Sequence, residues 1–152
     1  MSHAAFVSRL RRSPLAFDAE AGADARTRFA DLPPDLVGLI AGTAGSAPYL
    51  KGLMEKEEPW LRAALSGAPE AALAEEFARL RALPPDQLAT GLRQGKRRVA
   101  LLTALADLGG VWPLENVTGA LSDLADLAVN KALQAFTADE IRRGKLPGAA
   151  PE

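Results

Sequence analysis

Apolar residues in the second half of the chain recur at alternating steps of four and three, the period of a helix that buries one face. Pro84 and Pro85 precede the first of two such runs, and Gly109 and Gly110 end it as a left-handed C-terminal cap does. The same steps resume after Pro113. We therefore predict an antiparallel hairpin of two helices, over about 85–108 and 114–136. The repeating positions are Leu88, Leu92, Gly95, Val99, Leu102 and Ala106 in the first run and Leu114, Val117, Leu121, Leu124 and Ala128 in the second.

A further helix start follows the hairpin. Thr137, with Glu140 three residues later, has the form of a capping box, in which each side chain bonds a free backbone N–H of the first turn. Gly144 and Pro147 come after it and are typical of a helix end. This pattern predicts a short final helix.

The first part of the chain is less regular than the rest. Prolines and glycines interrupt each apolar run in residues 1–45, so we expect an irregular lead-in with short helices around 18–31 and 35–41. From there the helix starts are orderly, which predicts a single helical domain over 46–147. The small and polar residues of 148–152 predict a disordered tail.

Composition supports a fold made of helices alone. The 152 residues include 31 Ala and 24 Leu, both good helix formers, against only 8 Val and Ile together. We therefore predict an all-α fold, a multi-helix array that ends in the long hairpin and the short final helix.

Missing residue types exclude several kinds of chemistry. The chain has no cysteine, which rules out disulfides, a thiolate nucleophile and cysteine-rich zinc sites, and His3 is its only histidine, which rules out a Ser-His-Asp triad or a two-histidine metal site in the core. A net charge of −1 offers no overall field for nucleic acid or an anionic membrane. No apolar run is long enough for a membrane span or a signal peptide. We expect a cytoplasmic protein that binds neither nucleic acid nor membrane.

One basic cluster is a candidate partner contact. Arg93, Lys96 and Arg97 share one side of a predicted helix, and Arg98 points away from them. The three could bind phosphate or the acidic surface of a partner protein. They are also compatible with an ordinary solvated helix face, because no aromatic residue or glycine cradle accompanies them.

Pairs of carboxylates are the remaining candidates for chemistry. Asp123 with Asp126, and Glu55 with Glu58, stand three residues apart, a spacing that can bring two carboxylates to one Mg²⁺ ion or into general acid–base roles. Such pairs are also common on solvated helices, and the sequence shows neither a third ligand nor a glycine-rich phosphate loop. We therefore assign no catalytic, cofactor-binding or metal-binding residue.

The hairpin geometry predicts one ion pair. If its turn is centred near Trp112, Arg98 and Asp126 lie level with each other on the two antiparallel helices. We expect these two side chains to form an ion pair that holds the hairpin together.

Several segments resemble a known family when taken together. LRQGKRRVALL (92–102), ADL (106–108), LENVT (114–118) and LSDLAD (121–126) resemble the helical region of glutamine synthetase adenylyltransferases, also called glutamate-ammonia ligase adenylyltransferases. These are large bifunctional enzymes: one nucleotidyltransferase domain removes AMP from a tyrosine of glutamine synthetase by phosphorolysis, and a second attaches it from ATP. The resemblance covers 84–147 well. It implies structural roles for its motif residues Arg98, Asp107, Ser122 and Asp126.

The resemblance also implies what this chain lacks. The family's Gly-Ser … Asp-x-Asp metal-binding motif is expected shortly after Pro147, and the sequence stops at Glu152. The chain therefore looks like an N-terminal helical fragment that supports or docks and is inactive alone. Mg²⁺, ATP, glutamine synthetase, the PII nitrogen-signalling protein and the remainder of the chain are implied for the parent enzyme. The alternative is a free-standing helical adaptor that binds an acidic partner through Arg93, Lys96 and Arg97.

Overall fold

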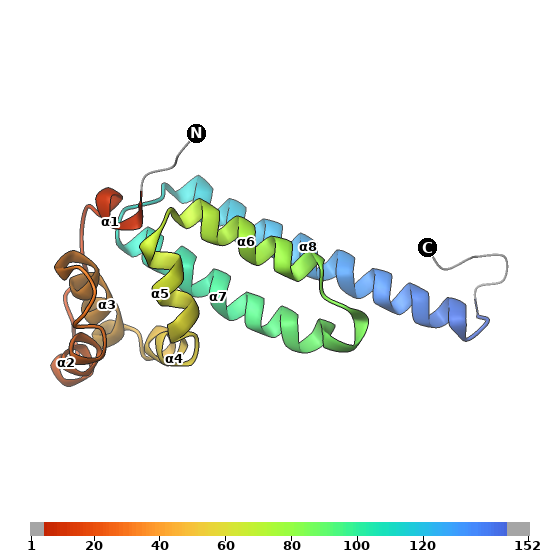
Figure 1. Ribbon diagram of the computed structural model, residues 1–152, viewed down its shortest axis with the longest axis horizontal. Helices are drawn as coiled ribbons and strands as arrows, with labels where there is room; N and C mark the ends of the chain where they lie inside the picture. The colour runs from red at the N-terminus through yellow and green to blue at the C-terminus, as the bar shows by residue number, and fades with distance from the viewer. Residues whose placement is uncertain (1–4, 146–152) are drawn as a thin grey trace.

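The computed structural model describes residues 5–145, and within that range every regular element is helical, which confirms the predicted all-α fold (Figure 1). His3 and the tail predicted over 148–152 lie outside the described residues. The elements are α1 (Phe6–Arg9), α2 (Ala19–Arg28), α3 (Pro34–Ser46), α4 (Pro48–Lys56), α5 (Glu58–Ser66), α6 (Pro69–Arg81), a single 3₁₀ turn η1 (Pro85–Gln87), α7 (Leu88–Leu108) and α8 (Leu114–Arg142).

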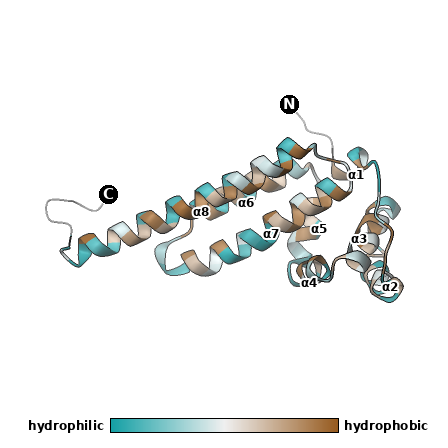
Figure 2. Cartoon of the chain, turned by 180° about the vertical axis from the view of Figure 1, so that it is seen from behind, coloured by the Kyte–Doolittle hydropathy of each residue, from teal (hydrophilic) through white to brown (hydrophobic). Residues whose placement is uncertain are grey.

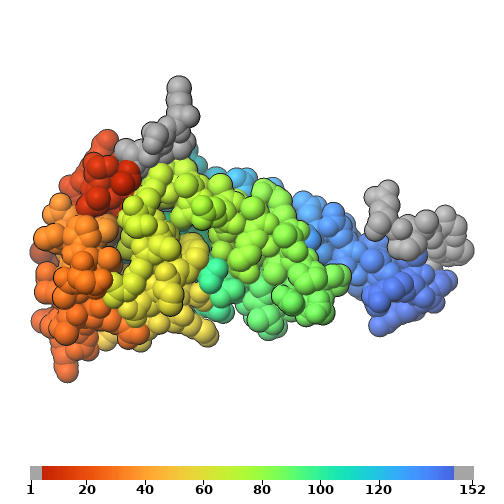
Figure 3. Space-filling model, in the orientation of Figure 1, coloured from red at the N-terminus to blue at the C-terminus, as the bar shows by residue number. Residues whose placement is uncertain are grey.

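The helices form an elongated molecule. The long helices α6, α7 and α8 run alongside one another, whereas α2 and α3 pack as a pair at one end (Figures 1 and 2). Short helices α4 and α5 connect the two groups. The C-terminal part of α8 projects beyond the ends of α6 and α7, and Figure 3 shows it standing clear of the rest. No helix in the described part of the chain is long and apolar enough to cross a membrane.

The core lies where the two groups of helices meet. A large buried cluster joins residues of α1 and α3, such as Phe6 and Leu39, to Leu101 and Leu105 of α7. A smaller cluster between α6, α7 and α8 is formed by buried Phe77, Leu80, Val99 and Leu124. The helices of the first 45 residues thus contribute to the same core as the hairpin, and the boundary proposed near residue 46 stays a prediction.

The predicted hairpin is present. Gly110 has φ +66°, its N–H donates to the carbonyl oxygen of Asp107 (2.9 Å), and the N–H of Val111 donates to that of Ala106 (2.8 Å). These two bonds satisfy carbonyl oxygens in the last turn of α7, and they require the left-handed conformation that glycine adopts without strain.

The short final helix predicted after Thr137 is wrong, because α8 continues without a break from Leu114 to Arg142. Residues 132–136 are Ala-Leu-Gln-Ala-Phe, with no proline or glycine to interrupt the helix, so a capping-box pattern alone does not start a new one. The helix ends at Arg142, two residues before the left-handed Gly144 (φ +72°) at which the sequence predicted an end.

An extended segment, residues 10–18, connects α1 to α2 and runs along α3. The N–H of Asp18 donates to the carbonyl oxygen of Gly45 (2.7 Å), and the Ser46 hydroxyl donates to that of Leu15 (2.8 Å). The segment lies so close to α3 that a Cβ atom added at Gly42 would be 1.8 Å from the carbonyl oxygen of Pro14. The helix expected over 35–41 is accordingly longer, since its glycines do not end it.

Candidate functional site

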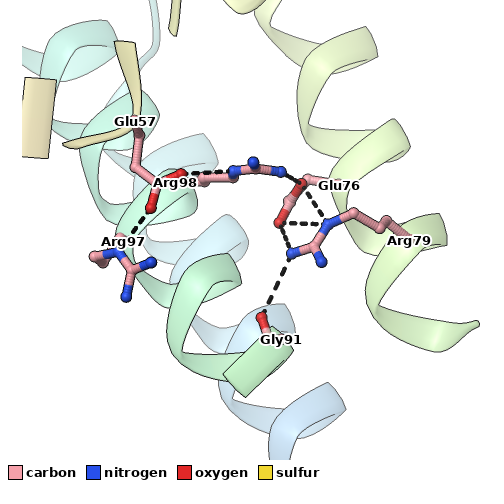
Figure 4. A network of polar contacts seen from close by, with 6 residues as sticks. All are labelled: Glu57, Glu76, Arg79, Gly91, Arg97 and Arg98. Atoms are coloured by element: carbon pink, nitrogen blue, oxygen red, sulfur yellow. Dashed lines mark hydrogen bonds and ion pairs between the residues drawn. The ribbon is translucent and has the colours of Figure 1, made fainter. Parts of the chain in front are cut away.

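The most concentrated charged site in the described residues is a buried ion network at the centre of the molecule (Figure 4). Arg98 of α7 donates from Nε to Glu57 (2.9 Å) and from Nη1 to Glu76 of α6 (3.0 Å). Arg97 donates to the other oxygen of Glu57 (2.7 Å), and Arg79 forms a two-pronged bond with Glu76. Glu57 and Glu76 are only 4% and 2% exposed, so their charges depend on these partners.

Local structure places each carboxylate. Glu57 lies between α4 and α5, because its N–H ends α4 by donating to the carbonyl oxygen of Leu53 (2.9 Å) and Pro59 stands in the first turn of α5. Glu76 lies on the buried face of α6 beside Phe77. The Arg98 guanidinium also stacks over Trp60, 5.4 Å from the ring centre. The network therefore connects the α4–α5 junction, α6 and α7.

The electrostatics of Glu57 follow from this arrangement. Burial alone would raise the pKa of its carboxyl, but hydrogen bonds and charges from Arg97 and Arg98 outweigh that effect and hold the pKa below its ordinary value. Because the folded-state pKa is lowered, the ionised carboxyl stabilises the fold fully above the unfolded pKa, about 4.3. That stabilisation is lost as the pH falls through the lower folded pKa.

We therefore expect the melting temperature to fall as the pH drops below about 4.3, and Glu57→Gln to remove part of this dependence. At pH 7 the variant should melt below the wild type, because a neutral amide binds the two arginines less strongly than a carboxylate. The difference should shrink as the pH falls below about 4.3, because the carboxyl of the unfolded wild type then takes up a proton that the folded protein, with its lowered pKa, binds less readily. Thermal melts from pH 7 to 3 test this, and a constant difference would contradict it.

A second polar cluster fastens α1 to the α7–α8 turn. The Glu70 carboxylate accepts hydrogen bonds from Arg9 Nη1 (2.7 and 2.8 Å) and from Trp112 Nε1 (2.6 Å). Arg9 also donates to the carbonyl oxygen of Val111 (3.0 Å). Burial would raise the pKa of Glu70, but these donors hold it below its ordinary value. The cluster holds structural elements together, and its carboxylate is fully engaged.

The ion pair predicted between Arg98 and Asp126 is wrong. Arg98 points to Glu57 and Glu76, while Asp126 is exposed beside a groove that Arg81 also lines. The prediction placed only the two hairpin helices and could not include α6 or the α4–α5 junction, which supply both carboxylates.

The other sequence candidates lie on the surface or in internal contacts. Arg93 and Lys96 are exposed, whereas Arg97 is bound to Glu57, so the three side chains are not equally available to a partner. Asp107 and Ser122 are exposed, and the backbone carbonyl of Asp107 accepts a hydrogen bond from Arg12 (2.9 Å). Whether any of them contacts a partner or has a family-specific role stays a prediction.

The predicted carboxylate pairs do not form a metal site in the described residues. Glu58 binds Arg28 (2.5 Å) and Arg62 (2.9 Å), and Asp123 and Asp126 border an open groove. Nowhere in residues 5–145 do three acidic, histidine or cysteine side chains gather closely enough to hold a metal ion. These residues therefore do not fit the Mg²⁺ that the family resemblance implies for the parent enzyme.

Sequence reasoning missed the two buried carboxylates, although one signal was present. Glu76 occupies a position between Leu73, Phe77 and Leu80 on the apolar face of a predicted helix, where a charged residue requires a buried partner. Glu57 has no such signal, because its burial depends on the junction between two short helices.

Comparison with known proteins identifies the family. Residues 38–152 match the model of the glutamate-ammonia ligase adenylyltransferase family. The bifunctional glutamine synthetase adenylyltransferase/adenylyl-removing enzyme of Rhodopseudomonas palustris is 36% identical over 135 residues, 86% of this chain and 14% of that protein. Proteins of the same name from Bradyrhizobium diazoefficiens and Caulobacter vibrioides are 40% and 39% identical over 75% and 72% of the chain, which covers 12% of each.

This chain thus spans about one seventh of the length of the relatives it matches. No solved structure is significantly similar to it. The family match covers most of the chain, including α4 to α8 and therefore the whole ion network. The chain belongs to the glutamate-ammonia ligase adenylyltransferase family.

Proposed function

We propose that this chain is the N-terminal helical region of a bifunctional glutamine synthetase adenylyltransferase/adenylyl-removing enzyme, and that it supports the catalytic parts or docks glutamine synthetase without taking part in the chemistry. The observation that carries this proposal is the family match over residues 38–152 in a chain that covers 14% of a curated relative.

The side-chain chemistry of the described residues supports a scaffolding role. The buried carboxylates Glu57 and Glu76 and the partly exposed carboxylate of Glu70 are each bound by arginine, so they are engaged in holding helices together. A general acid or base needs a carboxylate that can reach a substrate, and a metal site needs several such groups together. Among residues 5–145 no three such groups gather as a metal site requires.

The whole enzyme, under this proposal, attaches AMP to a tyrosine of glutamine synthetase from ATP and removes it by phosphorolysis. Its Mg²⁺ and nucleotide would be bound by other parts of the enzyme. Its protein partners would be glutamine synthetase and the PII nitrogen-signalling protein, and it would act in the cytoplasm.

An activity measurement tests whether the chain is inactive without the rest of the enzyme. The 152-residue chain is incubated with adenylylated glutamine synthetase and phosphate, and the release of AMP is measured beside the full-length protein encoded at the same locus. We expect release by the full-length protein and none by the chain. Release by the chain alone would contradict the proposal. A reading frame that closes directly after codon 152 would also contradict it and favour the adaptor.

Docking is tested separately, through the exposed basic residues. We expect the fluorescently labelled chain to bind glutamine synthetase, and the double variant Arg93→Glu, Lys96→Glu to bind at least about tenfold more weakly if this face makes the contact. The double variant Arg142→Glu, Arg143→Glu, which reverses the same number of exposed charges at the C-terminal end of α8, is the matched control. Equal loss in both variants would indicate non-specific charge attraction instead.

A further inference from the structure

Helix α8 carries a second apolar face that packs on nothing in the described residues. We call it the outer stripe. Its four large members are well exposed: Leu114 and Val129 by 66%, Phe136 by 65% and Leu121 by 42%. Small residues alternate with them, so that the stripe consists of Leu114, Thr118, Leu121, Ala125, Val129, Ala132 and Phe136, all exposed and spaced by three or four residues.

The outer stripe differs from the rest of the exposed surface of α8. The inner face packs on α6 and α7 through Ala120 and Leu124. Most other exposed positions along the helix are polar, including Glu115, Asp123 and Asn130, and Leu133 (59% exposed) is the large apolar exception. A surface helix needs only one apolar stripe, so a second continuous one indicates that another surface covers it.

The spacing of the outer stripe is symmetric about Ala125. Leu121 and Val129 lie four residues on either side of it, Thr118 and Ala132 seven, and Leu114 and Phe136 eleven. Each pair matches in size: small with small, large with large. A second α8 laid antiparallel across Ala125 therefore places every member beside its symmetric counterpart, as a two-fold interface requires.

From this symmetry we propose that the outer stripe is a self-association surface, on which a second copy of this chain packs with its α8 antiparallel and the two-fold axis at Ala125. Small residues at the centre allow two helix axes to approach to about 8–10 Å, and alternating large side chains interdigitate. The inference is independent of the proposed function.

The dimensions of the outer stripe determine the affinity that we expect for the dimer. Its ends, Leu114 and Phe136, lie 22 residue steps apart, about 33 Å of helix, and a helix is about 10 Å wide. A contact of that size is close to the lower limit for specific interfaces, about 1,000 Å² in total. We therefore expect a weak dimer, with a dissociation constant of micromolar order.

Cysteine cross-linking tests the geometry directly, because the chain has no cysteine of its own. In the proposed dimer only residue 125 meets its own copy, at a Cα–Cα distance of about 5 Å, within disulfide range. We expect Ala125→Cys to form a disulfide dimer at least about tenfold faster than Thr118→Cys, which occupies the same face. A mixture of Thr118→Cys and Ala132→Cys should cross-link between the two variants. Equal rates for the two single variants would overturn the antiparallel arrangement.

Sedimentation tests the association without cross-linking. We expect the wild type to shift from monomer to dimer with concentration, and Val129→Glu to weaken the association at least about 100-fold, because its carboxylate would be buried in the interface. The control Asn130→Glu, exposed on the same turn but outside the stripe, should dimerise normally. Circular dichroism verifies that both remain helical. A wild type that stays monomeric at every concentration overturns the proposal and indicates another cover, such as the remainder of a longer enzyme.

Discussion

Replacing Arg98 with methionine lowers the free energy of unfolding by about 3 kcal/mol, because it removes the one side chain that binds both buried carboxylates. Truncating one partner of a buried ion pair costs roughly 3–5 kcal/mol when the other charge is left uncompensated. The lower end applies here, since Glu57 keeps Arg97 and Glu76 keeps Arg79. Urea unfolding at pH 7 measures the difference.

Two comparisons separate this effect from simple loss of a charge. Arg93→Met, at an exposed position of the same helix, should change stability by less than about 0.5 kcal/mol. Adding Glu57→Gln and Glu76→Gln to Arg98→Met should restore part of the lost stability, because neutral amides cost less to bury than carboxylates without a full set of partners. If the triple variant is less stable than Arg98→Met, the remaining Arg97–Glu57 and Arg79–Glu76 pairs stabilise the fold by more than the incompletely paired charges cost, which contradicts this explanation.

The sequence predicted the long hairpin well because its signals are local. The apolar steps of α7 and α8 and the left-handed Gly110 depend only on residues close in the chain, and Gly144 ends α8 for the same reason. The prediction of a new helix start at Thr137 was wrong because a capping side chain acts only where the backbone already departs from the helix.

The ion network was not predictable in the same way. Arg98 was assigned to the wrong carboxylate. The α4–α5 junction brings Glu57 to it from 41 residues away in the sequence, and α6 brings Glu76 from 22 residues away. Periodicity indicates which face of a helix is buried, but not which other helix meets that face. The candidate contact residues on the surface have the same limitation, because their partner is another molecule.

The glycines of α3 show that glycine in a sequence can indicate either the end of a helix or a close contact with another segment. Gly42 and Gly45 suggested interruptions of a helix, but the structure uses them as contact points for the extended segment 10–18. A helix without side chains at these positions lets another backbone approach closely. Sequence alone does not distinguish a glycine that ends a helix from one that accommodates a neighbour.

Gly42→Ala should therefore destabilise the protein by about 2 kcal/mol, even though alanine is the better helix former. The new Cβ would lie 1.8 Å from the carbonyl oxygen of Pro14 and 2.7 Å from its carbonyl carbon, so the extended segment has to move away from α3. Such overpacking costs about 3 kcal/mol, and the gain in helix propensity offsets about 1 kcal/mol of it. Chemical unfolding measures the net effect.

Gly52→Ala provides the matched control, because Gly52 is exposed within α4 and an added Cβ there meets nothing within 4 Å. That variant should gain up to about 1 kcal/mol from helix propensity alone. The two substitutions are chemically identical, so their difference of about 3 kcal/mol isolates the contact with the extended segment. Equal effects of the two substitutions would mean that residues 10–18 are not held against α3 in solution.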